Sequence, residues 1–169
     1  SGQDNYSWTL QQQPLGATRV SPQVTGEEMR ITGEAASDSF GYTLATGDLN
    51  ADGKVDLVVS AYVGASSAGR VYIFYNDGNY PAGAGNADAV ITGESGSNFG
   101  TALITEDFNA DGKADLAVGA WLYSSFAGRY YIFYSDGSIP AMASDADAII
   151  TGEASSNYLG YSFTKADFN

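Results

Sequence analysis

Two nine-residue stretches decide the fold of this chain: DLNADGKVD at residues 48–56 and DFNADGKAD at residues 107–115. A third stretch, DFN at 167–169, starts in the same way. The surrounding sequence repeats as well, because residues 40–94 align with residues 99–153 without a gap and more than half of the aligned positions are identical. Self-similarity at a fixed period of about 60 residues indicates a repeat architecture.

Each repeating unit has the same order of short apolar runs and turns. In the first unit the nonapeptide leads into VDLVVSAY, then GRVYIFYNDG and ADAVITGE, with Gly-, Ala- and Pro-rich segments between them. Runs rich in Val, Ile, Tyr and Phe that are bounded by Gly, Asn, Asp and Pro predict four short strands per unit. Because VYIFY at 71–75 and YYIFY at 130–134 are apolar on both faces, each sheet is expected to pack between two others.

Four strands per unit favour an all-β fold, a β-propeller built from four-stranded antiparallel blades, with an incomplete ring within this chain. The alternative is a β-sandwich of two similar halves, which predicts polar alternation on the outer faces. The propeller divides the chain into five parts. These are an N-terminal segment with possible extra strands (1–26), the last strand of a preceding blade (27–39), two blades with an acidic loop each (40–98 and 99–157), and the first strand of a next blade (158–169).

The nonapeptides carry oxygen donors at positions 1, 3, 5 and 9, which are Asp48, Asn50, Asp52 and Asp56 in the first copy and Asp107, Asn109, Asp111 and Asp115 in the second. Gly53 and Gly112 at position 6 allow the positive φ of a sharp bend. Such hard donors suit Ca²⁺, which takes six to eight oxygens, so the pattern predicts two complete calcium sites. The backbone carbonyls of position 7 are expected to complete them while the side chains point away; these residues are Lys54 and Lys113. A third, partial site is predicted at Asp167 and Asn169.

An EF-hand loop begins with the same D-x-N-x-D-G pattern, but it needs a bidentate Glu at position 12 and a helix on each side. Position 12 is Val59 or Val118, each within a predicted strand, so the EF-hand is rejected. The other alternative is a plain Asp/Asn/Gly hairpin turn. Two near-identical copies and the start of a third argue against it.

The composition excludes several classes of function. The chain has 20 acidic and 7 basic residues, a formal net charge of −13 and no basic stretch, which argues against a nucleic-acid partner. No run of about 18 apolar residues exists, so no membrane insertion is expected. The chain has neither histidine nor cysteine, which removes Ser/His/Asp triads and thiolate metal sites. Every carboxylate cluster recurs in each unit, whereas an active site is normally singular, so the chain is predicted not to be an enzyme.

The units resemble the FG-GAP repeats of integrin α-subunit-type β-propellers. Those repeats have Phe-Gly near the start and a Gly-Ala-Pro-like triplet after the calcium loop. The matching residues here are Phe40-Gly41 with Ser60-Ala61-Tyr62, and Phe99-Gly100 with Gly119-Ala120-Trp121, without the proline. The resemblance covers residues 27–169. It implies that each acidic loop joins the first, innermost strand of a blade to the second strand and holds one Ca²⁺.

The resemblance also implies a non-catalytic module for extracellular adhesion or protein–protein interaction, on a secreted or cell-surface protein with a protein or glycan ligand. Two alternatives remain open. One is a carbohydrate-binding lectin that uses Tyr62 and Trp121, which occupy equivalent positions in the two units. The other is an assembly subunit that closes a ring or builds a filament from several copies, with a lone strand at 159–166 joining a lone strand at 28–33 of a neighbour through open blade edges.

Overall fold

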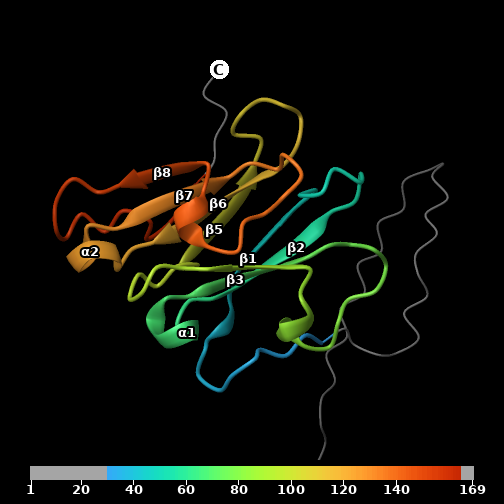
Figure 1. Cartoon of the computed structure of the whole chain (residues 1–169), viewed down its shortest axis with the longest axis horizontal. Coiled ribbons are helices and arrows are strands. Elements are labelled where there is room, and N and C mark those ends of the chain that lie inside the picture. The colour runs from blue at the N-terminus through green and yellow to red at the C-terminus, as the bar shows by residue number, and fades with distance from the viewer. Residues whose placement is uncertain (1–29, 165–169) are drawn as a thin grey trace, which may run out of the picture.

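The computed structural model describes residues 30–164. The predicted extra strands in 1–26 and the partial calcium site at Asp167 and Asn169 lie outside the described residues. Between these limits the chain forms two four-stranded antiparallel sheets that lie face against face (Figure 1). The all-β prediction is therefore confirmed.

The first sheet has the strand order β1-β2-β3-β4, so each strand pairs with its neighbour in the chain. Its strands are β1 (Phe40–Gly47), β2 (Asp56–Ala61), β3 (Arg70–Phe74) and β4 (Ala89–Thr92). One turn of helix, α1 (Gly64–Ser67), connects β2 to β3, and a 3-10 turn at Ala84–Asn86 precedes β4. The four strands predicted for each unit are present.

The second sheet repeats this arrangement with the order β5-β6-β7-β8. Its strands are β5 (Ala102–Glu106), β6 (Asp115–Ala120), β7 (Arg129–Phe133) and β8 (Ala148–Thr151). The helical turn α2 (Tyr123–Phe126) and a 3-10 turn at Ala143–Asp145 occupy the equivalent connections. The register repeats too, since Val59 pairs with Tyr72 in the first sheet and Val118 with Tyr131 in the second.

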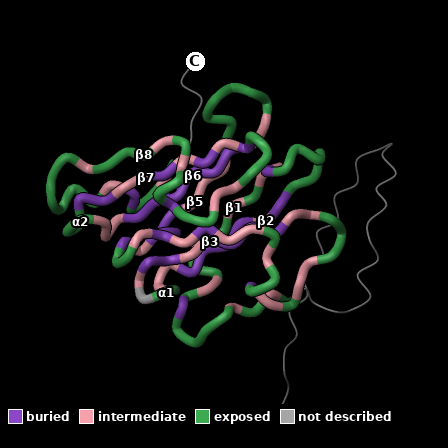
Figure 2. The backbone as a smooth tube through the Cα atoms, in the orientation of Figure 1, coloured by how far each residue is buried: buried purple, intermediate pink, exposed green. Residues whose placement is uncertain are grey.

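The main core lies between the two sheets. It consists of side chains from one face of each sheet and from the connecting segment: Val58, Val71, Ile73, Ile91, Phe99, Leu116, Val118, Tyr131 and Phe133. A second cluster covers the opposite face of the first sheet and includes Tyr72 and Phe74, with Ile31 and Phe40 packed against it. The central strands β2 and β3 of the first sheet are therefore buried on both faces (Figure 2). A two-sheet sandwich with polar outer faces would leave one face of these strands exposed.

Successive units meet along a seam that is made largely of backbone. The Phe99 N–H donates a hydrogen bond to the Ala68 carbonyl at 3.0 Å, and the Leu159 N–H donates to the Ala127 carbonyl at 3.2 Å. Glycine is needed here: a Cβ on Gly69 would lie 2.0 Å from the Phe99 carbonyl oxygen, and one on Gly128 would lie 1.9 Å from that of Leu159.

The lone strands predicted at 28–33 and 159–166 are reduced in the described residues to isolated bridges. Thr32 bridges to Gly83, and Leu159 bridges to Gly128, both in parallel. A strand needs a ladder of partners along its length, and neither segment has more than this single bridge within residues 30–164. The proposed boundaries of the five parts stay a prediction.

Candidate metal-binding loops and the seam between blades

The acidic loops connect the first strand of each sheet to the second: residues 48–55 join β1 to β2, and residues 107–114 join β5 to β6. The strands that enter the loops lie next to each other. The Thr105 hydroxyl of β5 donates a 2.6 Å hydrogen bond to the Thr46 carbonyl of β1. The two loops therefore lie at the same end of two adjacent first strands.

The first acidic loop is a tight bend whose polar side chains bond to its own backbone. The Asp48 carboxylate accepts hydrogen bonds from the N–H groups of Asp52 at 3.1 Å and Gly53 at 2.8 Å. The Asn50 side-chain oxygen accepts from the Asp52 N–H at 3.0 Å. The bend passes through Ala51 at φ 59° and Gly53 at φ 82°. The glycine predicted to allow a positive φ therefore has one.

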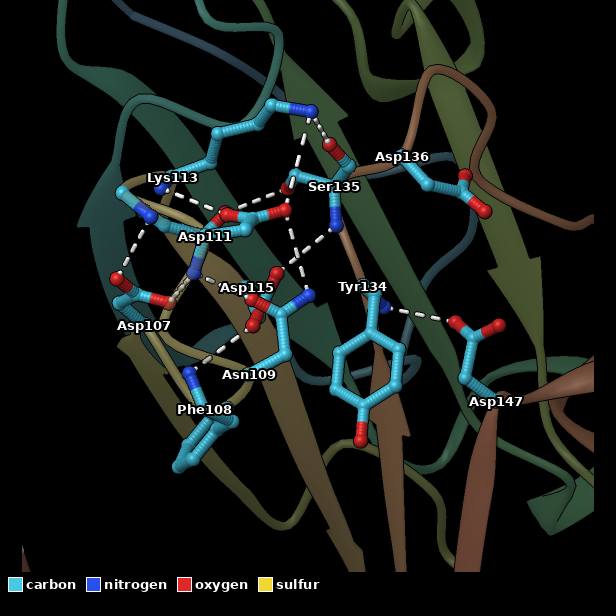
Figure 3. A network of polar contacts seen from close by, with 12 residues as sticks. Asp107, Phe108, Asn109, Asp111, Lys113, Asp115, Tyr134, Ser135, Asp136 and Asp147 are labelled. Carbon is cyan, nitrogen blue, oxygen red and sulfur yellow. Dashed lines mark hydrogen bonds and ion pairs between the residues drawn. The ribbon is translucent and has the colours of Figure 1, made fainter.

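The second acidic loop repeats this geometry (Figure 3). Asp107 accepts from the N–H groups of Asp111 at 3.0 Å and Gly112 at 2.8 Å, and the Asn109 oxygen accepts from the Asp111 N–H at 2.9 Å. Both copies therefore adopt the same bend with the same hydrogen bonds.

The carboxylate at position 9 differs from the others because it is buried and accepts a backbone hydrogen bond with each oxygen. Asp56 is 1% exposed and accepts from the Leu49 N–H at 2.8 Å and the Asn76 N–H at 2.9 Å. Asp115 is 0% exposed and accepts equivalent bonds from Phe108 and Ser135, both at 2.9 Å (Figure 3). These bonds offset the cost of burying a charge. Each aspartate thus ties the start of its acidic loop to the turn after the third strand.

The lysine side chains at position 7 do not point away from the loops, so that expectation is wrong. The Lys54 ammonium donates to the Asn76 carbonyl at 3.0 Å and lies 3.3 Å from an Asp52 oxygen. Lys113 donates to the Ser135 carbonyl at 3.0 Å and lies 3.8 Å from Asp111. In both loops the ammonium reaches back across the loop to the backbone carbonyl that follows the third strand. The pKa of Asp52 is lowered, first by the hydrogen bond from the Lys54 backbone N–H and also by the Lys54 ammonium.

The donor set of each loop fits a hard cation in its chemistry, because it consists of Asp, Asn and carbonyl oxygens. Among residues 30–164, however, no three acidic side chains converge closely enough to form a metal-binding group. The carboxylates are directed at backbone N–H groups instead. An ionised carboxylate has about four lone-pair sites, so these hydrogen bonds leave acceptor capacity on Asp48, Asp52, Asp107 and Asp111. Asp52, Asp107 and Asp111 are exposed and Asp48 is partly buried, so this capacity is accessible to solvent.

The two aromatic candidates for ligand binding lie in different surroundings. The Tyr62 ring lies 4.2 Å from the Tyr42 ring. Trp121 belongs to a larger cluster, with ring centroids 5.5 Å from Phe126, 5.9 Å from Tyr158 and 5.8 Å from Tyr161. Both candidates are partly buried, so each has a packing role whether or not it also binds a ligand.

A polar cluster across the seam was missed by the sequence analysis. The Glu34 carboxylate accepts from the Arg70 guanidinium at 2.6 Å and from the Tyr72 hydroxyl at 2.7 Å. Burial, followed by the hydrogen bond to Glu34, raises the pKa of Tyr72 to about 12. The glutamate ends an ITGE motif of one unit, and the arginine and tyrosine belong to the R-x-Y motif of the next. Both motifs recur in the sequence, and this recurrence could have indicated that their side chains interact.

The same cluster recurs one unit further along. Glu94 accepts from Arg129 at 2.7 Å and from Tyr131 at 2.5 Å. Burial and the bond to Glu94 again raise the pKa of the tyrosine. We call each set of Glu, Arg and Tyr a seam cluster.

Comparison with known proteins agrees with this fold and these loops. The FG-GAP repeat model matches residues 40–74 and 99–133. The chain is therefore an FG-GAP repeat protein, with two repeats that form propeller-type blades. More particularly, it is similar to integrin α subunits.

Human integrin alpha-7 is 34% identical over 143 residues, which cover 82% of this chain and 11% of the integrin. Chicken integrin alpha-6 is 38% identical over 142 residues, covering 80% of this chain and 13% of that protein. A rat phosphatidylinositol-glycan-specific phospholipase D is 40% identical over 109 residues, covering 56% of this chain and 13% of the phospholipase. The chain thus spans roughly a tenth of the length of each relative. Within residues 30–164, no helix is both long and apolar enough to cross a membrane.

Proposed function

We propose that this chain is a calcium-binding, non-catalytic module of an extracellular protein that acts in adhesion or protein–protein interaction. The observation that carries the proposal is the repeated acidic loop, which places the same oxygen donors in the same bend at the same point of both blades. Similarity to integrin alpha-7 and alpha-6 supports the adhesion class and a secreted or cell-surface location.

Calcium would stabilise the loop that joins the first two strands of each blade. In the first loop the donors would be the side chains of Asp48, Asn50 and Asp52, the Lys54 carbonyl, and a remaining lone pair of Asp56. The cation would displace the Lys54 ammonium from Asp52, since both compete for the same carboxylate. Binding to the folded loop alone stabilises the fold, because the unfolded chain does not hold the donors together.

Thermal unfolding with Ca²⁺ and with a chelator tests the calcium proposal. At a free Ca²⁺ concentration of 100 times the dissociation constant, each site adds about 2.7 kcal/mol to the free energy of unfolding. We expect a higher Tm in Ca²⁺, and about half of the gain in the single variants Asp52→Asn and Asp111→Asn. Asp136→Asn, which removes one exposed negative charge outside the loops, is the matched control. An equal Tm in Ca²⁺ and chelator, with no heat of binding in calorimetry, would contradict the proposal.

A role in catalysis is not part of the proposal. One similar protein is named a phospholipase D, but the matched region covers 13% of that protein. The described residues include no histidine or cysteine, since the whole chain has none. The carboxylates gathered in the loops recur in both blades, as expected for a structural cation site.

Carbohydrate binding is the second candidate function, and the aromatic cluster around Trp121 favours it. Within this cluster Tyr158 is 45% exposed and Tyr161 is 63% exposed, and exposed rings can stack on sugars. The equivalents of Phe126 and Tyr158 in the first unit are Ser67 and Asn98, so the repeat itself does not require these aromatics. A glycan array probed with the chain and with Tyr161→Ala tests this candidate. Binding that is lost in the variant supports it, and no binding in Ca²⁺ contradicts it.

A further inference from the structure

The helical turn after the second strand of each unit has a similar backbone but begins with a different residue. The first residue is Gly64 in α1 and Tyr123 in α2. The Gly69 N–H donates a hydrogen bond to the Gly64 carbonyl at 2.9 Å, and the Gly128 N–H donates to the Tyr123 carbonyl at 3.0 Å. Position 64 is therefore the structural equivalent of position 123, without its side chain.

In the second unit the ring of Tyr123 covers the arginine of the seam cluster. The guanidinium carbon of Arg129 lies 3.6 Å from the centroid of the Tyr123 ring, which is a cation–π contact. The Arg129 side chain is 16% exposed. The equivalent Arg70 side chain, whose unit has glycine at position 64, is 36% exposed. The first unit thus lacks the ring that covers the arginine in the second.

A pocket of about 210 Å³ lies between Gly64 and Arg70. It is lined by residues 34–38, 63–65, Arg70 and Tyr72. The Val63 N–H donates to the Asp38 carbonyl at 3.3 Å, so α1 and the segment that leads into β1 lie side by side as its two walls (Figure 1). Pockets for drug-sized ligands measure about 300–1,000 Å³. This smaller pocket suits a single ring.

The pocket is open because residue 64 has no side chain. A Cβ placed on Gly64 would lie 3.7 Å from the Ala61 Cβ and 3.9 Å from the Asp38 Cβ, which are ordinary van der Waals distances. A side chain at position 64 can therefore enter the pocket without displacing its walls. A ring supplied from outside the chain can use the same space.

We propose that this pocket binds an aromatic side chain of a partner protein, with the ring stacked on the Arg70 guanidinium as Tyr123 is stacked on Arg129. The inference rests on the proposed role in protein–protein interaction and names the group that is recognised. The guanidinium attracts the electron-rich face of a ring. Because the carboxylates of Glu34 and Asp38 also line the pocket, an unmodified tyrosine is favoured over a phosphorylated one.

A titration of the ¹⁵N-labelled chain with the capped peptide acetyl-Gly-Tyr-Gly-amide, followed by NMR, tests the proposal. The ring current of a bound tyrosine should shift the Gly64 N–H and the Arg70 Nε–H resonances, whereas those of Arg129 stay in place because Tyr123 already covers it. We expect a Kd on the order of 1 mM for a single ring. The same peptide with leucine in place of tyrosine is the control and should bind at least tenfold more weakly.

Two reciprocal variants locate the site. Gly64→Tyr fills the pocket from within the chain and should weaken peptide binding at least tenfold, while a well-dispersed NMR spectrum verifies that the variant is folded. Tyr123→Gly opens the equivalent space and should add a second set of shifts around Arg129.

The proposal is overturned if Gly64→Tyr binds the peptide as tightly as the wild type, or if the leucine peptide binds equally well. Binding of p-cresol, the free side-chain analogue, without binding of the tyrosine peptide would also contradict it, because the pocket would then take a small aromatic compound and not a protein side chain. Each titration is repeated in chelator. Peptide binding that persists there, together with a Tm that does not respond to Ca²⁺, would reject the calcium proposal and leave this one standing.

Discussion

Tyr131 of the second blade donates a 2.5 Å hydrogen bond to the Glu94 carboxylate at the end of the first blade, and Arg129 binds the same carboxylate oxygen at 2.7 Å. The three groups come from two different repeats. The contact therefore depends on how the repeats sit relative to each other, and on neither repeat alone. It adds a charged side-chain contact to the backbone hydrogen bonds and apolar packing between the blades.

Replacing Glu94 should destabilise the packing of the two blades. Glu94→Gln removes the charge that accepts from Arg129 and Tyr131, and the side chains of the pair are only 16% (Arg129) and 30% (Glu94) exposed. Hydrogen bonds to charged groups contribute about 1.5–3 kcal/mol, so we expect the free energy of unfolding to fall by about 2 kcal/mol in urea titrations. Glu34→Gln, whose ion pair is more exposed, should cost less, about 1 kcal/mol. An equal or smaller loss for Glu94→Gln would contradict this ranking.

Stability should decrease in strongly alkaline solution because of the seam tyrosines. The folded-state pKa of Tyr72 is raised to about 12 from an ordinary value of 10, by burial and by the bond to Glu34, and that of Tyr131 is raised for the same reasons. The unfolded chain loses these protons near pH 10 and the folded chain only at higher pH. The stabilisation is therefore full below pH 10 and is lost between pH 10 and about 12.

Urea midpoints measured from pH 8 to pH 12 would detect this alkaline loss. Tyr72→Phe has no proton to lose, so its decline above pH 10 should be shallower than that of the wild type. Equal slopes for the two proteins would exclude Tyr72 as a source of the effect.

Asp56 and Asp115 should matter for folding even without a cation. Each accepts backbone N–H bonds with both oxygens while buried. An asparagine there would direct its NH₂ group at a backbone donor and leave that donor unsatisfied, at a cost of about 2 kcal/mol. Chelator-treated Asp56→Asn is therefore expected to unfold at lower urea than chelator-treated Asp48→Asn, because Asp48 is only partly buried. The reverse order would contradict a structural role for the hydrogen bonds at position 9.

The glycines of the seam should be sensitive to the addition of one methyl group. Gly69 and Gly78 both have positive φ, at 83° and 95°, so alanine strains the backbone at either position by about 1–2 kcal/mol. Only at Gly69 would the new Cβ also collide with backbone, 2.0 Å from the Phe99 oxygen; nothing lies within 4 Å of one at Gly78. Gly69→Ala should thus lower Tm well beyond Gly78→Ala in differential scanning calorimetry. Equal losses would mean that the seam can move apart freely.

Features that arise from short-range sequence patterns could be predicted from the sequence. Contacts that depend on how the repeats pack against each other could not. The strands and the bends at Gly53 and Gly112 follow from short-range patterns, and the structure has them. The hydrogen bonds of Asp56 and Lys54 to Asn76 join residues about 20 positions apart. The hydrogen bond from Arg129 to Glu94 spans 35 positions. None of these three hydrogen bonds can be assigned before the strand order and the stacking of the sheets are known.

The close approach of backbone at Gly69 and Gly128 has a consequence for how such a chain can vary. The distance between neighbouring units is set there by peptide groups and not by side chains. Substitutions on the adjacent turns should therefore leave the spacing of the units unchanged. The turn that reads GASS at 64–67 and YSSF at 123–126 illustrates this freedom. Its side chains differ in size between the units, yet the following glycine meets the next unit in the same way.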